Sequence, residues 1–352
     1  MTTSTGNRAA NLDAARLLLS SLGLTPQDLA DTSPPRPPAP TFGMFVPKVA
    51  AAVSAGTRET YGPYWNYAVE AWGERPIDDV APSEIKALAE HIKANVVIRR
   101  NGRGGNGAVE NFIGALRCLY KLADDDELIE PGTSPAAKVA KPARGDSTRY
   151  ALPPERLAEI NHIGSTTGDD PELDALILRL HTETAGRRQG GLNLRPQDLD
   201  REQCLIYLRE KANTVRWQPV SPTLMKHLVA HARTRHAVLP HQQLLRYRSG
   251  QPITTRRYDY LWKRIGQHLP WARAQGVSTH WLRHTTLTWV ERNFNAAIAR
   301  GYAGHSTNTS ANTAGSISIY TKATLHEIAT ALATLTGEPH PLATGNAEFG
   351  GN

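Results

Sequence analysis

The most informative segment of this chain is His280-Trp281-Leu282-Arg283-His284-Thr285, which is followed by Gly304-His305 and then by Tyr320. An arginine holds phosphate oxygens, an imidazole moves protons, and a tyrosine oxygen can attack a phosphodiester and keep it as a covalent ester. A His-x-x-Arg pair alone is a weak signal, and a lone helical histidine is more often structural. The order of these features therefore carries the argument, and it indicates chemistry on a phosphodiester.

A second group of polar residues lies upstream, between an expected helix and an expected hairpin. The apolar pattern of Leu176–Thr184 predicts a helix that ends at Ala185-Gly186-Arg187-Arg188. Two short strand patterns follow, around Leu205–Leu208 and Thr214–Trp217, and the turn between them contains Lys211. Cations on a turn and on a hairpin suit a site that binds a phosphate.

Taken together, these motifs resemble the tyrosine recombinases of the phage-integrase family. The catalytic domain of that family carries a Thr-Gly-Leu-Arg-type turn, a hairpin lysine, His-x-x-Arg, Gly-His and a C-terminal tyrosine. The resemblance implies a mainly α-helical chain with a small β-hairpin or sheet in the catalytic domain, preceded by a helical, SAM-like core-binding domain. It implies these catalytic positions: Arg188, Lys211, His280, Arg283, His305 and the nucleophile Tyr320.

The resemblance also implies a role for each catalytic residue. Arg188 and Arg283 would hold the non-bridging phosphate oxygens, and His280 would accept or orient the tyrosine proton. Lys211 would protonate the departing 5′-oxygen, and His305 would bind a phosphate oxygen or hold the pocket. Strand cleavage would leave a 3′-phosphotyrosyl link that preserves the bond energy, so ATP is not expected. The cationic side chains would take the place of a metal ion, and no other cofactor is expected.

Three features depart from the family pattern. Arg187 stands before Arg188, where an apolar residue is usual, so the choice of Arg188 rests on its spacing from Gly186. Gly191 occupies the position, three residues after that arginine, where the family commonly has an acidic residue. The 15-residue gap from His305 to the tyrosine is longer than usual and predicts an enlarged loop. Tyr302 is the nearest rival nucleophile, but it precedes the Gly-His motif.

Length and composition set the broader limits. A chain of 352 residues is long for one domain, so two are expected. A formal net charge of +7 and a pI near 9.4 favour a polyanionic partner without proving one. The two cysteines, Cys118 and Cys204, lack metal-ligand spacing and lie in apolar surroundings, so no zinc site or disulfide framework is expected. No apolar run approaches a membrane span and no signal core is present, which predicts a cytoplasmic, nucleoid-associated protein without a membrane partner.

Composition shifts along the chain predict its domains. Residues 1–40 contain one helix and a proline-rich linker or arm. Residues 41–142 have helical periodicity, and the resemblance implies that they are the helical core-DNA-binding domain. Residues 143–151 are a linker, residues 152–337 form the catalytic domain, and residues 338–352 form a disordered tail. After the tyrosine, residues 324–335 predict an amphipathic helix, which either packs in the core or is exchanged between protomers.

The glycine-rich segment Gly102–Gly107 matches a dinucleotide-binding fingerprint. That fingerprint needs a preceding strand, whereas Ser83–Val97 reads as one continuous helix, so we interpret it as a glycine loop between helices or a basic loop that meets DNA phosphates. The predicted DNA contacts are Arg58, Arg99, Arg100, Arg103, Lys138 and Lys141.

The expected partners are double-stranded DNA recombination sites, bound by a homotetramer, with a possible directionality or host factor. Two alternatives remain open from the sequence. One is an enzyme with the same chemistry and another task, such as a type IB topoisomerase or a telomere resolvase. The other is an inactive, DNA-binding relative, against which the filling of all six polar positions argues.

Overall fold

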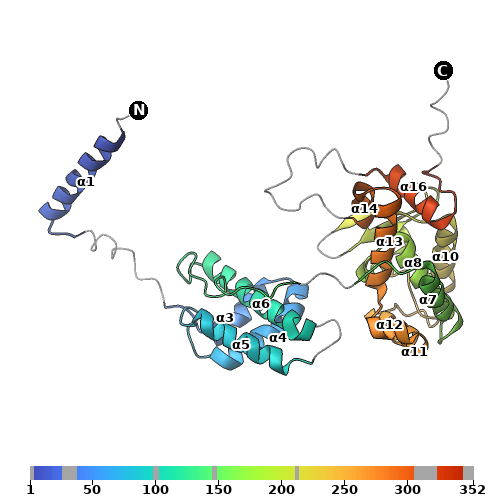
Figure 1. Cartoon of the computed structure of the whole chain (residues 1–352), viewed down its shortest axis with the longest axis horizontal. Helices are drawn as coiled ribbons and strands as arrows, with labels where there is room; N and C mark the ends of the chain where they lie inside the picture. Colours follow the sequence, from blue (N-terminus) through green and yellow to red (C-terminus); the bar gives the residue numbers. More distant parts are fainter. Residues whose placement is uncertain are drawn as a thin grey trace, which may run out of the picture. The chain divides into compact units, whose positions relative to one another are not determined.

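A computed structural model describes residues 4–25, 38–97, 103–144, 149–210, 214–304 and 323–343. The chain divides into two compact units, Met1–Gly145 and Asp146–Asn352, each with a hydrophobic core of its own (Figure 1). It is mainly helical with one small sheet, which confirms the predicted fold class. Within the described residues, no helix is both long and apolar enough to cross a membrane.

The first unit is a set of helices around an aromatic core. After the N-terminal helix α1 (Ser4–Ser21), its main helices are α3 (Phe42–Ala52), α4 (Ala55–Trp72), α5 (Pro82–Asn95) and α6 (Asn106–Asp125). Trp65 of α4 is buried and donates its indole N–H to the Ala115 carbonyl of α6 at 2.9 Å. Helix α6 buries a long apolar stripe between α4 and α5, so it is the centre of this unit.

The glycine-rich segment of this unit lies between two helices. The described residues before it, up to Val97, form helix α5 and its end and contain no strand of the kind that a dinucleotide site requires. The short 3₁₀ turn η1 (Arg103–Gly105) leads directly into α6. A side chain at Gly105, whose φ is 89°, would meet Lys93 of α5 at 2.9 Å. The glycine therefore permits a close approach of α6 to α5, as expected for a helix–helix loop.

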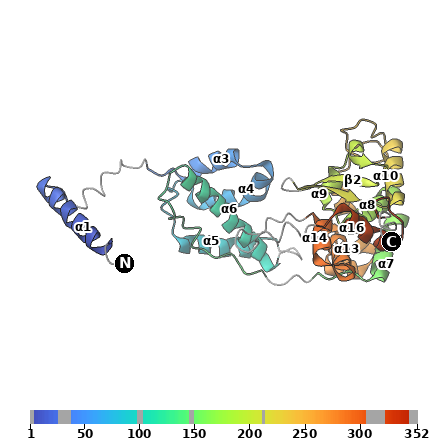
Figure 2. The same ribbon diagram turned by 90° about the horizontal axis from the view of Figure 1, so that it is seen from above.

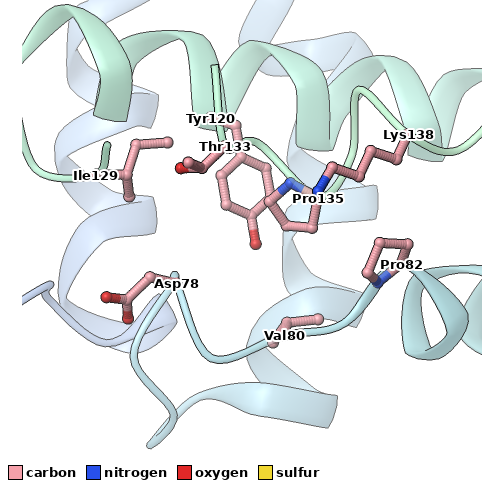
Figure 3. A pocket seen from close by; sticks show the side chains of 8 residues that line it. All are labelled: Asp78, Val80, Pro82, Tyr120, Ile129, Thr133, Pro135 and Lys138. Carbon is pink, nitrogen blue, oxygen red and sulfur yellow. The ribbon is translucent and has the colours of Figure 1, made fainter. Parts of the chain in front are cut away.

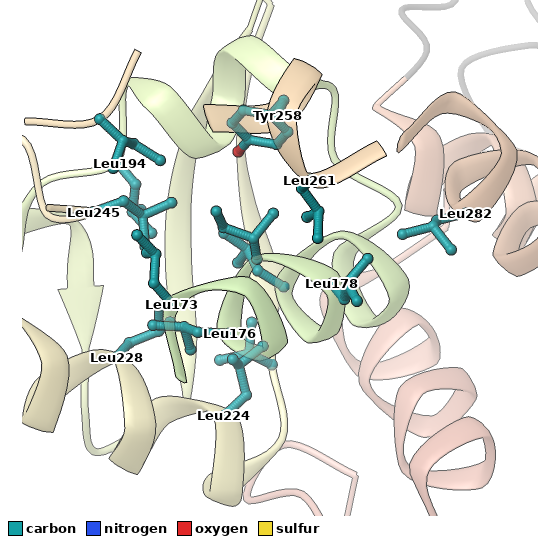
Figure 4. Packing of buried hydrophobic residues seen from close by; sticks show 14 of the residues in the cluster. Leu173, Leu176, Leu178, Leu194, Leu224, Leu228, Leu245, Tyr258, Leu261 and Leu282 are labelled. Carbon is teal, nitrogen blue, oxygen red and sulfur yellow. The ribbon is translucent and has the colours of Figure 1, made fainter. Parts of the chain in front are cut away.

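The second unit combines a set of helices with a three-stranded sheet. The helices are α7 (Pro154–Thr166), α8 (Pro171–Thr184), α9 (Arg188–Leu192), α10 (Pro222–Thr234), α11 (Thr255–His268), α12 (Pro270–Gln275), α13 (Thr279–Asn293), α14 (Ala296–Ala303) and α16 (Leu325–Thr336), with a 3₁₀ turn η2 (Pro196–Asp198). Helix α8 is the central one, because α7, α10 and α13 all pack against it. Its buried Leu173, Leu176 and Leu178 lie in the main core (Figure 4).

The sheet is antiparallel, in the order β1 (Leu199–Asp200), β2 (Leu205–Arg209) and β3 (Val215–Pro219). Strands β2 and β3 form the expected hairpin, in which Tyr207 lies opposite Trp217 with ring centroids 5.1 Å apart. Alternation sends Ile206 and Leu208 to the buried face. The same alternation turns the next even-numbered residue, Glu210, towards the end of α8.

Candidate active site

The turn after α8 is held by several independent contacts. Ala185 ends the helix in the left-handed conformation with φ 49°, and the Gly186 N–H donates to the Thr184 hydroxyl at 3.0 Å. His181 contacts the Gly186 carbonyl through Nδ1 and the Tyr258 hydroxyl through Nε2, both at 2.9 Å. Burial lowers the pKa of His181 to about 4, so the ring is neutral near pH 7 and serves as a fixed strut. These contacts fix the backbone directly before Arg187.

The two adjacent arginines after the turn point to different surroundings. Arg187 donates Nη1 to Glu210 Oε2 at 2.6 Å, and its side chain is 35% exposed. Arg188 lies 3.4 Å from Asp259, and this pair is exposed, at 47% and 70% of the two side chains. Arg187 is one of the charges that depress the pKa of Arg283 and His280, whereas Arg188 is not among them. The structure thus groups Arg187, and not the predicted Arg188, with the His-x-x-Arg residues.

A sequence signal for Arg187 was available. Thr184-Ala185-Gly186-Arg187 aligns with the Thr-Gly-Leu-Arg-type turn when the threonine, rather than the glycine, sets the register. The structure gives that threonine a task, because its hydroxyl accepts the Gly186 N–H. The Gly186 spacing instead gives the register that places Arg188 at this position.

Arg283 joins the turn after α8 to the end of α14. The side chain is 4% exposed, and it donates to the Ala185 carbonyl and, at 2.9 Å, to the Ala303 carbonyl. Burial and the nearby charge of Arg187 lower the pKa of Arg283 to about 10, so the guanidinium still carries its charge near pH 7. One buried cation thereby brings together segments about a hundred residues apart in the sequence.

His280 lies three residues before Arg283, at the start of α13, and keeps an exposed face. Partial burial of its ring, with the charges of Arg149 and Arg283, lowers the pKa of His280 below its ordinary value. The imidazole is therefore mostly neutral near pH 7, which is the form that can accept a proton. The neighbouring His284 contacts the Arg149 carbonyl at 3.0 Å through Nε2 and so ties α13 to the segment before α7.

Three of the predicted catalytic residues, Lys211, His305 and Tyr320, lie outside the described residues. The described residues that flank them are nonetheless informative. A side chain at Gly304 would meet Arg216 Nη1 at 2.6 Å, and one at Gly301 would meet the Ala323 side chain at 2.8 Å. The chain therefore leaves α14 beside Arg216 and returns to α14 before α16.

Tyr302, the rival nucleophile, is part of the core. It is fully buried, and its hydroxyl donates to the Glu183 carbonyl. Burial raises the pKa of Tyr302 far above its ordinary value, so the phenolate that a nucleophile needs is strongly disfavoured. Tyr302 thus packs α14, to which it belongs, against α8.

Helix α16 packs within its own unit. Ile328 and Leu332 are buried together with Tyr302, and α16 contacts α14, β3 and α8 (Figures 1 and 2). Beyond the helix, Glu338 accepts hydrogen bonds from Arg179 at 2.7 Å and from the Thr223 N–H at 3.1 Å. The apolar stripe of this helix therefore serves as core packing, the first of the two expected uses.

The predicted DNA contacts that are described all lie on the first unit. Arg58, Lys138 and Lys141 are exposed. Arg103 is exposed as well, but it pairs with Glu110, which also accepts from Arg144 Nε at 2.9 Å. These hydrogen bonds lower the pKa of Glu110 to about 2, so the carboxylate is ionised near pH 7 and offsets the positive charges of Arg103 and Arg144. Arg99 and Arg100 lie outside the described residues.

A cavity of about 210 Å³ opens in the first unit beside the end of α6 (Figure 3). Its lining mixes Asp78 and Lys138 with proline, valine and isoleucine side chains. The Tyr120 hydroxyl in its wall already donates to the Ile77 carbonyl at 2.7 Å. Among the described residues, no group of three or more His, Cys, Asp and Glu side chains is placed to hold a metal ion.

The geometry of the second unit defines a domain that gathers cations around a turn, a hairpin and a His-x-x-Arg helix. Residues 151–323 match the family model of the phage integrase family, so this part of the chain belongs to that family. No curated protein matches the sequence of the chain.

Solved structures share the fold at low sequence identity. A lambda integrase dimer bound to a COC′ core site is 14% identical, covers 77% of this chain and 97% of its own, and superposes with a TM-score of 0.57. A Tn1549 transposon integrase in complex with transposon right end DNA is 16% identical, covers 84% of this chain and 100% of its own, with a TM-score of 0.59. A lambda integrase tetramer bound to a Holliday junction covers 86% and 88% of the two chains at 14% identity, with a TM-score of 0.57. The likeness extends over both units.

Proposed function

We propose that this protein is a site-specific tyrosine recombinase, an integrase that cleaves and rejoins DNA through a 3′-phosphotyrosyl intermediate. The observation that carries the proposal is the position of Arg283, which binds the carbonyls of Ala185 and Ala303. Through these bonds the turn before Arg187 and the chain before His305 meet the His-x-x-Arg helix. Their convergence supports a single phosphate-binding site made from motifs distant in sequence.

Within this site we assign the first phosphate-binding arginine to Arg187. The partly exposed guanidinium of Arg187 and that of Arg283 would hold the non-bridging oxygens and stabilise the charge that gathers as the tyrosine attacks. The loss of such a contact commonly costs about 3–4 kcal/mol in the transition state. Arg188, on the exposed pair with Asp259, is left to a minor role at the protein surface.

The remaining steps belong to proton transfer and covalent attack. Tyr320 would attack the phosphorus, and His280, mostly neutral near pH 7, would take or orient its proton. Lys211, which comes two residues after the end of β2, would protonate the departing 5′-oxygen. His305 follows Gly304, which packs on Arg216, and would bind a phosphate oxygen or hold the pocket. The protein's own cations would balance the charge, so we expect the reaction to proceed in EDTA and without ATP.

The two units would close around duplex DNA, with the core-binding domain at residues 41–142 and the catalytic domain at residues 152–337. Arg58, Lys138 and Lys141 are exposed on the first unit and would bind phosphates, which fixes the register of the protein on the duplex. The Holliday-junction tetramer among the structural relatives supports a homotetramer on paired sites. Helix α16 packs against its own unit, so an exchange between protomers would have to displace it from α14, β3 and α8.

The test is covalent capture on DNA. Wild type and Tyr320→Phe are incubated with DNA from the neighbourhood of their own gene, denatured in SDS and separated by electrophoresis. A protein–DNA adduct in wild type alone is the expected result, and it would identify both the chemistry and the nucleophile. Binding of DNA without any adduct would instead favour an inactive relative.

A second assay separates recombination from topoisomerase activity, the alternative within the same chemistry. Supercoiled DNA with two candidate sites is incubated with the protein, and the products are resolved as topoisomers and as recombinant joints. Recombinant joints are expected. Relaxation without any joint would contradict the proposal and favour the topoisomerase alternative.

A further inference from the structure

We propose that Glu210 is the positioning residue of the active site, holding Arg187 in place of an acidic side chain that helix α9 lacks. This inference rests on the proposed function, because it concerns the residue assigned there to the phosphate. The side chain of Glu210 is fully buried at the end of strand β2, immediately before Lys211. An acidic residue is rarely buried so completely unless it is paired, so its partners decide its role.

Glu210 grips Arg187 at two points. Oε1 accepts the backbone N–H of Arg187 at 2.5 Å, and Oε2 accepts its guanidinium Nη1 at 2.6 Å. The first contact fixes the start of α9 and the second fixes the direction of the side chain. The Arg187 side chain is 35% exposed, whereas that of Glu210 is fully buried. Glu210 therefore holds Arg187 from the protein interior, and part of the arginine side chain remains accessible to a ligand.

The same carboxylate holds the hairpin and the end of α14. Oε2 also accepts Arg216 Nη1 of strand β3 at 2.8 Å, and the Glu210 N–H donates to the Thr214 carbonyl at 2.8 Å, closing the base of the turn. Arg216 in turn abuts Gly304. One side chain thus links the segments that precede Lys211 and His305 with the turn that carries Arg187.

Glu210 fills a space that is open because residue 190 is a glycine. A side chain at Gly190, three residues after Arg187, would begin 3.2 Å from Glu210 Cγ and 3.4 Å from its Oε1. A carboxylate built on residue 190 would therefore compete for the place where the Glu210 carboxylate now stands. In this chain the negative charge arrives from strand β2 instead of from α9.

Charge balance requires the group at this point. Among the described residues, Glu210 is the sole carboxylate in ion-pair distance of Arg187 or Arg216. Burial opposes ionisation of Glu210, but the charge of Arg216 and the backbone hydrogen bond from Arg187 outweigh it and keep the pKa of this carboxyl below its usual range. Without the Glu210 carboxylate, the positive charges of Arg187, Arg216 and Arg283 would repel one another in a part of the protein where little water screens them.

The first experiment compares Glu210→Ala and Glu210→Gln with wild type in adduct formation on saturating DNA. Misplacement of a catalytic group by about 1 Å can cost about 10²-fold, so we expect a fall of about 10- to 100-fold for Glu210→Ala and a smaller fall for Glu210→Gln, whose amide oxygen can still accept one bond. Glu202→Ala, an exposed glutamate in the β1–β2 turn, is the matched control and should react like wild type. Melting temperatures and DNA dissociation constants are measured on each variant.

The second experiment separates positioning from general destabilisation. If Glu210 acts through Arg187, the substitution Glu210→Ala should cost little once Arg187→Ala is already present, so the two effects should not add. Moving the carboxylate should also restore function, because Glu210→Ala empties the space in front of residue 190. We expect Gly190→Asp with Glu210→Ala to recover much of the lost rate, whereas Gly190→Asp alone crowds the site and lowers it.

An adduct formed by wild type and equally fast by Glu210→Ala would overturn this inference and leave the proposed function intact. Additive effects of the Arg187 and Glu210 substitutions would overturn it as well, by showing that Glu210 acts elsewhere. Should Glu210→Ala fail to fold, the comparison of Glu210→Gln with wild type and with Arg187→Ala decides the question in the same way. Absence of any adduct in wild type would instead count against the proposed function itself.

Discussion

Two buried carboxylates of the second unit, Asp174 and Glu210, are each paired with two arginines, and the two clusters differ in how exposed those arginines are. Asp174 binds Arg257 and Arg264 at 2.7 and 2.6 Å, and these arginine side chains are only 3% and 6% exposed. Glu210 binds Arg216, 10% exposed, and Arg187, 35% exposed. The first cluster is closed on all sides and holds α8 against α11. The second keeps one cation partly open, as a site for an anion requires.

The largest effect is expected from the closed cluster, and it concerns stability. Asp174→Ala would leave Arg257 and Arg264 with buried charge, and such a loss commonly costs about 3–5 kcal/mol. Urea unfolding of the variant should show it, while Glu172→Ala, at an 80% exposed side chain, should cost less than about 1 kcal/mol. Equal costs for the two variants would contradict the distinction between buried and exposed carboxylates.

The open cluster should respond in rate. Arg187→Ala is expected to slow adduct formation by about 10²–10³-fold, because a donor to the charged transition state is removed. Arg188→Ala, on the surface pair with Asp259, should change the rate by less than about 3-fold. The two variants carry the same change of charge, so single-turnover rates on saturating DNA compare them directly. A larger loss for Arg188→Ala would return the assignment to that residue.

The pH dependence should sharpen the role of His280. Its pKa is lowered, so the neutral imidazole persists to lower pH than in an ordinary histidine with a pKa of about 6.5. We expect the rate of adduct formation to fall as the pH is lowered, with the midpoint of that fall below pH 6.5. Glu210 does not confuse the measurement, because its pKa is below the usual range of a carboxyl. An acid limb centred above pH 6.5 would be incompatible with a depressed His280.

The smallest effect is expected in the first unit, where Glu110 is paired at the surface. Glu110→Gln would release Arg103 and Arg144, and should strengthen non-specific DNA binding a few-fold with a steeper salt dependence. Stability should change by less than about 1 kcal/mol. Fluorescence anisotropy over a salt series measures the affinity, with the exposed Glu90→Gln as the control for net charge. Identical salt slopes for the two variants would show that Arg103 and Arg144 do not face DNA.

Much of the fold was readable from local patterns. The helix predicted to end at Thr184 ends there in the structure, and the hairpin lies at the predicted strands. The two-residue strand β1 was missed, because Leu199–Asp200 is too short to show an alternation. The helix before the glycine loop ends at Asn95, two residues earlier than predicted, since backbone fraying at helix ends leaves little trace in composition.

The candidate site was less readable. The positions of His280 and Arg283 followed from a motif on one helix, whose residues keep a fixed spacing. The choice between Arg187 and Arg188 did not, because neighbouring residues at a turn point in different directions and only their contacts tell which one faces the site. Glu210 carried no signal as a positioning residue, since its partners lie 23 residues before it and six residues after it in the sequence.

The family resemblance, the helical character of both units and the hairpin could be predicted from the sequence, because these depend on residue type, order and short-range periodicity. Three features are seen only in the folded chain. Tyr302 is buried in the core, α16 packs against its own unit, and the Glu210 carboxylate fills the space beside Gly190 of α9. Burial and long-range pairing cause all three. A carboxylate becomes the partner of an arginine only when the packing of distant segments removes water from both.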